Sequence, residues 1–200
     1  MYLGTRTYNG YSGADVARGI LDQNGLNDVQ VKPTEGFLSD HYDPRSKTVN
    51  LSQEVYHGTS VSSLGVAAHE VGHAIQHSKN YMPLRIRAGL VPVANFGSWI
   101  AVPLIMLGFF IKASGLIFLG IIAFSLAVAF QIITLPVEFN ASSRALKALN
   151  NGGFIASDEL TPTRKVLNAA ALTYVAATIV AISQLLSLIM SFLASSSQDE

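Results

Sequence analysis

Three long stretches without a charged residue constrain this chain more than any other feature of its sequence. They cover residues 89–111, 113–137 and about 166–194, and Lys112 alone separates the first two. A helix needs about 20 apolar residues to cross the hydrocarbon core of a bilayer. Each stretch reaches that length, and buried helices of soluble proteins rarely run so far without a charge. The sequence therefore predicts three transmembrane helices.

The composition agrees with a membrane protein and excludes several other classes. Hydrophobic residues make up 50% of the chain and charged residues only 13%, a balance opposite to that of a disordered protein. The 13 basic and 13 acidic residues cancel, so nothing favours a nucleic acid as partner. The chain has no cysteine, which excludes a disulfide scaffold and thiolate chemistry. The partner that the composition indicates is a lipid bilayer, and it leaves the oligomeric state open.

The distribution of positive charge predicts the orientation in the membrane. Of the 13 lysines and arginines, all except Lys112 lie in residues 1–88 or 139–165. Positively charged segments next to membrane spans stay on the cytoplasmic side. We therefore expect both of these segments in the cytoplasm and the tail of residues 195–200 on the outer side.

The first segment is predicted to fold as an α+β domain. Ser12 is a candidate N-cap for a helix that ends near Asn24-Gly25. Residues 28–31 and 48–51 alternate apolar and polar side chains, as half-buried strands do. A second helix is expected from Thr59 or Ser60 to about Ser78. The complete predicted organisation is a cytoplasmic domain (1–88), a two-helix transmembrane hairpin (89–137), a cytoplasmic segment (138–165), a third transmembrane helix (166–194) and a tail (195–200).

The second helix carries the motif His69-Glu70-Val71-Gly72-His73. Residues four apart lie on one face of a helix, so both imidazoles can bind one Zn²⁺ ion. Glu70 is then placed to take a proton from a zinc-bound water, which the metal makes acidic. The flanking residues are small and apolar, which suits a partly buried site better than a solvated surface. The sequence predicts a catalytic zinc site with Glu70 as general base.

A third ligand must come from elsewhere in the chain, and Glu138 is the strongest candidate. It is the first charge after the second apolar stretch, and a carboxylate at the end of a span is costly without a partner. The expected topology returns this helix end to the side of the motif helix. His77 lies too far along the same helix to share one ion with His69 and His73. The weaker alternatives are His41, His57, Asp158 and Glu159.

The oxyanion of the reaction needs a donor beyond the metal, and the sequence leaves its identity open. Arg144 follows Glu138 by about one and a half helical turns and ranks first. An equally good reading makes Arg144 a positive anchor beside lipid headgroups. Three further candidates are His41, His57 and Tyr42. A strand around Lys47–Leu51 is expected to offer its edge to an extended substrate by β-augmentation.

Four segments together resemble a known family, the bacterial membrane-bound neutral zinc metallopeptidases of the YugP type. The segments are SGADVARGIL, GFLSDHYDPRSKTVNLS, AAHEVGHAIQH and LPVEFNASSRAL, and they extend over most of the chain. The resemblance implies a zinc endopeptidase of the bacterial inner or plasma membrane. The plan is also similar to HtpX-type and CAAX-prenyl-protease-type enzymes. On this resemblance His69, His73 and Glu138 are the zinc ligands, and Glu70 is the catalytic base.

The chain departs from the family pattern in two places. Members of the family usually begin with a further hydrophobic segment, which residues 1–13 are too short to supply. HtpX-like relatives tend to carry an aspartate four residues after the glutamate ligand, where this chain has Ser142, with Asn140 nearby. A neutral partner orients a ligand histidine less strongly than a carboxylate. We expect this difference to affect the catalytic rate more than the metal site.

The function predicted from the sequence is a zinc-dependent endopeptidase with a zincin-like cytoplasmic domain on about three membrane spans. Its active site is expected at the cytoplasmic surface, because the segment Thr59–Ser78 is too polar to span a bilayer. Its substrates are then membrane proteins or segments close to the membrane. The alternative is a non-catalytic assembly or scaffold protein that keeps a zinc site. Structural zinc sites usually have four protein ligands, often cysteines, and Glu70 would have no use in one.

Overall fold

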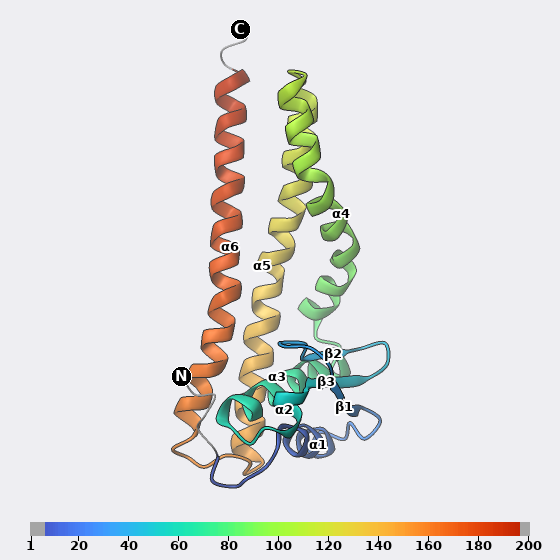
Figure 1. The fold of residues 1–200 in the computed structure, drawn as a ribbon. Coiled ribbons are helices and arrows are strands. Elements are labelled where there is room, and N and C mark those ends of the chain that lie inside the picture. Colours follow the sequence, from blue (N-terminus) through green and yellow to red (C-terminus); the bar gives the residue numbers. More distant parts are fainter. Residues whose placement is uncertain (1–6, 197–200) are drawn as a thin grey trace. The chain divides into compact units, whose positions relative to one another are not determined.

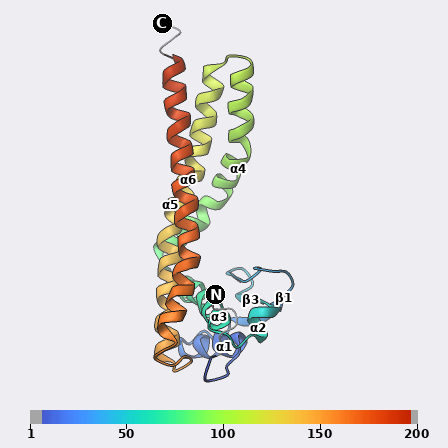
Figure 2. The ribbon, with the colours of Figure 1, turned by 60° about the vertical axis from the view of Figure 1, so that its left-hand side comes forward.

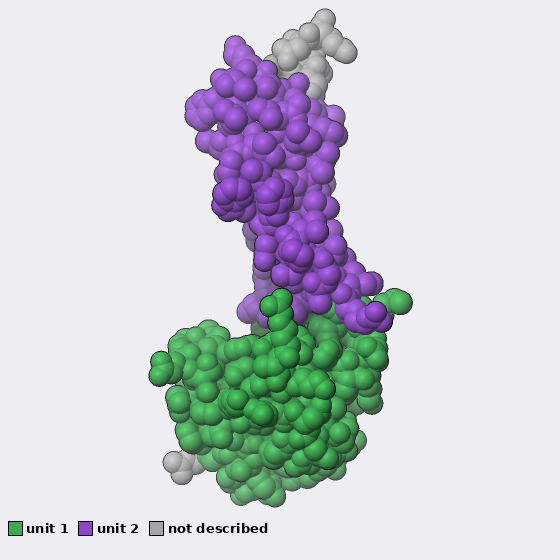
Figure 3. Space-filling model, turned by 90° about the vertical axis from the view of Figure 1, so that its right-hand side faces the viewer, with its two compact units in different colours: residues 1–84, 137–172 green, residues 85–136, 173–200 purple. Residues whose placement is uncertain are grey.

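The computed structural model describes residues 7–196, and Figure 1 shows its helices and strands. Most of this chain is helical, with one small three-stranded sheet. Two compact units can be distinguished (Figure 3): unit 1 comprises residues 1–84 and 137–172, and unit 2 comprises residues 85–136 and 173–200. The predictions for the extreme N-terminus and for most of the C-terminal tail fall outside the described residues.

Three helices are long and apolar enough to cross a membrane, as the uncharged stretches predicted. They are α4 (Met82–Phe110), α5 (Ser114–Asn151) and α6 (Leu160–Ser196), which Figure 2 shows from a second side. Large apolar side chains such as Trp99, 72% exposed, cover their surface, which suits contact with lipid. Each helix continues into polar residues at one end or at both ends of its uncharged stretch. A polar side chain ends the apolar segment but does not by itself end a helix.

Within unit 2, α4 and α5 form a closely packed hairpin. A Cβ atom at Gly97 would lie 2.7 Å from the carbonyl oxygen of Ala123, and one at Gly120 would lie 3.0 Å from that of Ala101. Such close contacts between backbones require small residues, as is common where membrane helices pack. Lys112, which separates the first two uncharged stretches, lies in the turn between the two helices with a φ of 55°.

Unit 1 begins with the helix α1 (Gly13–Gln23), whose start is fixed as predicted by Ser12. The Ser12 hydroxyl accepts a hydrogen bond from the Asp15 amide, and the Asp15 carboxylate accepts one from the Ser12 amide. This capping box satisfies two amides that the helix itself leaves unpaired. The apolar face of α1 (Val16, Ile20 and Leu21) is completely buried.

The sheet corrects several details of the prediction. Its strands are β1 (Gln30–Thr34), β2 (His41–Asp43) and β3 (Thr48–Ser52), in the order β1-β3-β2. The short strand β2 and the helix α2 (Gln53–His57), which follows β3, were not predicted. β3 pairs in parallel with β1 and antiparallel with β2. The prediction that the strand around Lys47–Leu51 offers its edge to a substrate is therefore wrong, because both edges of this strand are already paired.

The helix α3 (Val61–Ser78) runs through the core of unit 1 and begins after the N-cap Ser60. Its buried side chains pack against those of α1 and β3 and against the parts of α5 and α6 that belong to this unit. At Gly65 a Cβ atom would lie 3.6 Å from the Thr163 methyl group of α6. Packing against the core holds α3 in place along most of its length. Two of its buried side chains, Leu64 and Val71, are 0% exposed.

Candidate metal centre

Two histidines of α3 form one side of the candidate site. His69 and His73 are one helical turn apart, and their ring centroids are separated by 4.8 Å. The apolar residues of α3 face the core of unit 1. The two imidazoles lie on a different face of the helix. Both are largely but not completely buried, with side chains 17% and 13% exposed.

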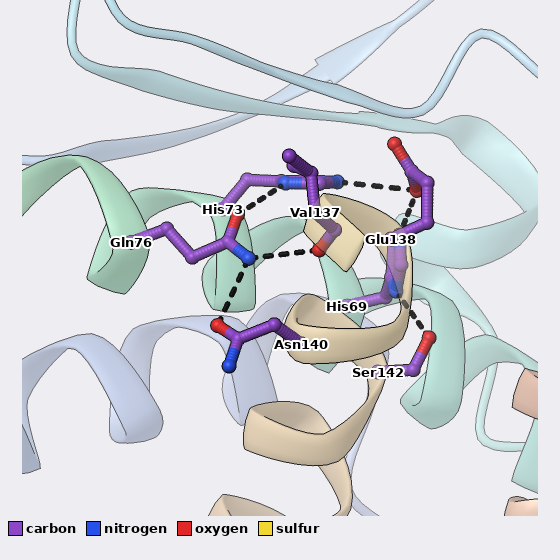
Figure 4. A network of polar contacts seen from close by, with 7 residues as sticks. All are labelled: His69, His73, Gln76, Val137, Glu138, Asn140 and Ser142. Carbon is purple, nitrogen blue, oxygen red and sulfur yellow. Dashed lines mark hydrogen bonds and ion pairs between the residues drawn. The ribbon is translucent and has the colours of Figure 1, made fainter. Parts of the chain in front are cut away.

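The third candidate ligand, Glu138, belongs to α5. Its side chain is 5% exposed, and its Oε2 lies 3.2 Å from Nε2 of His69 and 3.6 Å from Nε2 of His73. Figure 4 shows the carboxylate reaching toward both rings. The structure therefore brings together the three residues that the sequence suggested as ligands, although Glu138 is distant from the motif in the sequence.

This group fits a metal ion such as zinc. One ligand atom from each of His69, His73 and Glu138 can be chosen so that all lie within 4.8 Å of one another. Two imidazoles and one carboxylate are a common donor set of catalytic zinc sites, and three protein ligands leave a fourth position for water or substrate. These residues are positioned to bind a metal, and the rest of the chain offers no cysteine that would indicate a closed structural site.

Both candidate histidine ligands have a polar partner at their second ring nitrogen. Nδ1 of His69 lies 3.1 Å from the Ser142 hydroxyl, and Nδ1 of His73 lies 3.0 Å from Oε1 of Gln76. Such partners orient a metal-binding imidazole. Sequence analysis noted Ser142 but missed Gln76. The signal that could have revealed Gln76 is its polar side chain three residues after His73, in a helix segment that is small and apolar apart from the motif and its histidines.

Glu70 follows His69 directly on α3. Its carboxyl group is not one of the three candidate ligands. Burial raises the pKa of Glu70 above its usual value, while the neighbouring imidazoles of His73 and His69 oppose that change. A carboxyl group with a raised pKa is a stronger base than an exposed one. For His73, burial would lower the pKa, but the neighbouring carboxylates of Glu138 and Glu70 outweigh it and raise the pKa.

The weaker ligand candidates lie outside this group. Nδ1 of His77 is 2.9 Å from the Tyr42 hydroxyl, and Nδ1 of His41 is 2.7 Å from the Ser39 carbonyl oxygen. Glu159 is buried, and its carboxylate accepts hydrogen bonds from the backbone amides of residues 8 and 156. His57 and Asp158 are exposed.

Arg144 belongs to α5 and is partly buried. Its Nε donates a hydrogen bond of 2.7 Å to Oδ1 of Asn140, and its guanidinium carbon lies 5.9 Å from the centre of the Tyr81 ring. Its suggested part in binding the oxyanion stays a prediction.

The close approach of α3 and α5 depends on Gly72. A Cβ atom there would lie only 2.6 Å from the backbone oxygen of Ala141, so Gly72→Ala must push the two helices apart. We expect this variant to lose zinc affinity by about 10-fold or more, the range seen when the support of a metal site is disturbed. Zinc competition with a chromogenic chelator measures it. Gly115→Ala, where a Cβ meets no atom within 4 Å, is the matched control and should bind as the wild type does.

Three candidate membrane spans and a His-His-Glu group are together typical of a membrane protein with a peptidase-type metal site. The sequence model of the family described as "Putative neutral zinc metallopeptidase" matches residues 1–193, and the chain belongs to this family. A similar curated protein is the "Putative membrane protease YugP" of Bacillus subtilis (strain 168). It is 52% identical over 192 residues, which cover 96% of this chain and 85% of that protein. No solved structure gives a significant match.

Proposed function

We propose that this protein is a zinc-dependent endopeptidase of a bacterial membrane that cleaves membrane proteins or segments close to the membrane. The observation that carries the proposal is the grouping of His69, His73 and Glu138, whose ligand atoms lie within 4.8 Å of one another. Glu70 is a neighbouring carboxylate that this metal site does not need for binding. Family membership and the described relative, a "Putative membrane protease", support the same function.

The proposed mechanism gives each residue of the site one task. His69, His73 and Glu138 would hold the zinc ion, with Ser142 and Gln76 orienting the two imidazoles. A zinc ion in this position would activate a water molecule and polarise the peptide carbonyl. Glu70 accepts the proton of that water and later donates it to the leaving amine. Its raised pKa suits both steps, because the carboxyl group must be able to hold the proton between them.

We further propose that unit 1 is a zincin-like domain in which an extended substrate adds to β2. In zincin-like domains a small sheet lies beside the helix that carries the zinc motif, and here β2 contacts α3 through Tyr42 and His77. β2 pairs with β3 along one edge, and no other strand among the described residues pairs with it, which leaves its other edge for β-augmentation. This assignment replaces the central strand that the sequence suggested.

The activity is tested with the full chain purified in detergent and placed in liposomes. We expect cleavage of a co-reconstituted membrane protein, loss of cleavage with a zinc chelator and recovery when zinc is added back. Cleavage that persists in the chelator would contradict the zinc mechanism. If a soluble casein-like protein were cleaved as fast as the membrane substrate, the proposed preference for membrane-associated substrates would be wrong.

The cytoplasmic location of the site is a separate proposal that rests on the positive charge of its surroundings. The chain has no cysteine, so single cysteines can report orientation. We expect Lys112→Cys to react with a membrane-impermeant maleimide in intact cells. Ser46→Cys, in the turn between β2 and β3, should react only after the membrane is permeabilised. The reverse pattern would place the site on the outer surface.

A further inference from the structure

A chain of hydrogen bonds lies behind His73 and connects it to α5. Oε1 of Gln76 is 3.0 Å from Nδ1 of His73, and Nε2 of Gln76 donates to the Val137 carbonyl at 2.8 Å and to Oδ1 of Asn140 at 3.1 Å. Nε of Arg144 donates to the same Asn140 oxygen. Figure 4 shows the part of this chain from His73 to Asn140. Gln76 is 0% exposed, so water does not substitute for these partners.

The partners of Gln76 decide which way its amide group points. The Val137 carbonyl oxygen can only accept a hydrogen bond, so the Gln76 atom beside it must be the NH₂ group. The Gln76 oxygen then faces Nδ1 of His73 and can only accept. Nδ1 of His73 must therefore carry a hydrogen atom.

The far end of the chain is fixed by Arg144 in the same way. A guanidinium group only donates, so Asn140 must turn its oxygen toward Nε of Arg144. This oxygen then also accepts from the NH₂ group of Gln76, in agreement with the orientation set by Val137. Two groups that cannot exchange their roles, one acceptor and one donor, thus determine the direction of every hydrogen bond between them.

With the hydrogen atom on Nδ1, the Nε2 lone pair of neutral His73 faces the Glu138 carboxylate at 3.6 Å. A lone pair and a carboxylate at this distance repel each other unless a cation lies between them, either a metal ion or a second proton on His73. We propose that Gln76 is a positioning residue. It holds His73 as the Nδ1–H tautomer, through hydrogen bonds anchored by Val137 and Arg144, and so keeps Nε2 free to bind the metal.

His69 differs from His73 in this respect. Its Nδ1 partner is the Ser142 hydroxyl, which can donate or accept. In the absence of metal, Nε2 of His69 can therefore donate to Glu138 at 3.2 Å while Nδ1 accepts from Ser142. Only His73 is held in the metal-binding tautomer before the metal arrives.

The inference deepens the proposed zinc site, but its first test needs neither zinc nor peptidase activity. Metal-free protein with ¹⁵N-labelled histidine is studied by NMR at alkaline pH, and the His73 signals are assigned by their loss in His73→Asn. We expect the Nδ1–H tautomer for His73. In Gln76→Met the Glu138 carboxylate should draw the hydrogen atom to Nε2. A wild-type His73 in the Nε2–H form would overturn the proposal, whereas a zinc-bound protein that cleaves nothing would overturn only the peptidase function.

The second test measures zinc affinity by competition with a chelator. We expect Gln76→Met and Asn140→Leu to weaken zinc binding about 10- to 100-fold, as loss of partners to ligand histidines does. Asn140→Asp keeps the accepting oxygen and should stay within a few-fold of the wild type. Asn9→Ala removes an exposed hydrogen bond to the Gly153 carbonyl and is the control. Equal affinities in wild type, Gln76→Met and Asn140→Leu would contradict a positioning role.

Arg144 can be tested separately, because the two roles suggested for it affect different quantities. If Arg144 anchors the hydrogen bonds of Asn140 and Gln76, Arg144→Gln should lower zinc affinity in the same direction as Asn140→Leu. If Arg144 instead binds the oxyanion, this variant should slow cleavage and leave zinc affinity unchanged. The second outcome would remove Arg144 from the proposed chain of positioning residues.

Discussion

Glu70→Gln is expected to lower peptide cleavage by about 10²- to 10⁴-fold, the range contributed by a general base, while zinc stays bound. The amide keeps the size of the side chain but can neither take the proton of the attacking water nor return it to the amine. Glu70 is adjacent to His69 and is not one of the three residues whose ligand atoms form the candidate group. Zinc content by elemental analysis and cleavage rates, measured on the same preparations, test this prediction.

The matched control is Glu54→Gln, the same change at an exposed carboxylate in the first turn of α2. It should keep both zinc and activity. Wild type and Glu70→Gln that bind zinc equally, with neither cleaving any substrate offered, would favour the scaffold alternative. Glu70→Gln with undiminished cleavage would show that another residue is the base.

Glu138→Gln is expected to weaken zinc binding by about 10²- to 10³-fold. Zinc binding free energies of about 10–16 kcal/mol at four-ligand sites correspond to roughly 2.5–4 kcal/mol for each ligand. Since about 1.4 kcal/mol changes an equilibrium constant tenfold, loss of the charged ligand has an effect of this size. The amide leaves His69 and His73 in place, so weak binding should remain.

The control for Glu138→Gln is Glu159→Gln, because both glutamates belong to unit 1 and are buried, with 3% and 5% of the whole residue exposed. Glu159 accepts hydrogen bonds from backbone amides and not from the candidate ligands. Its replacement is expected to lower the stability of the protein and to leave zinc affinity unchanged. If Glu138→Gln bound zinc as tightly as the wild type, Glu138 would not be a ligand.

Local sequence patterns predicted the longer helices, although they missed α2. Ser12 and Ser60 stand where the structure places N-caps, because capping needs only a short polar side chain and the next few amides. The uncharged stretches marked three helices because length and hydropathy belong to the segment itself. The strand β2 was missed, since three residues carry too little periodicity to be recognised and are held by pairing with β3.

Part of the candidate site could likewise be predicted from local sequence, and part depended on packing. The motif of α3 determined His69, Glu70 and His73 as a unit, because four residues make one helical turn whatever surrounds the helix. The choice of Glu138 needed a topological argument, and its distance to the two imidazoles could be known only from the packing of α5 against α3 at Gly72.

The sequence by itself determined a chain with three apolar helices, a pair of histidines spaced for one metal ion and an adjacent carboxylate. These features depend on the covalent order of residues and on helix geometry. Only the tertiary structure decided that β3 is central and that Gln76 is buried against Val137 and Asn140. The physical reason is that hydrogen bonds between distant segments depend on which surfaces pack together, and local residue patterns do not encode that packing.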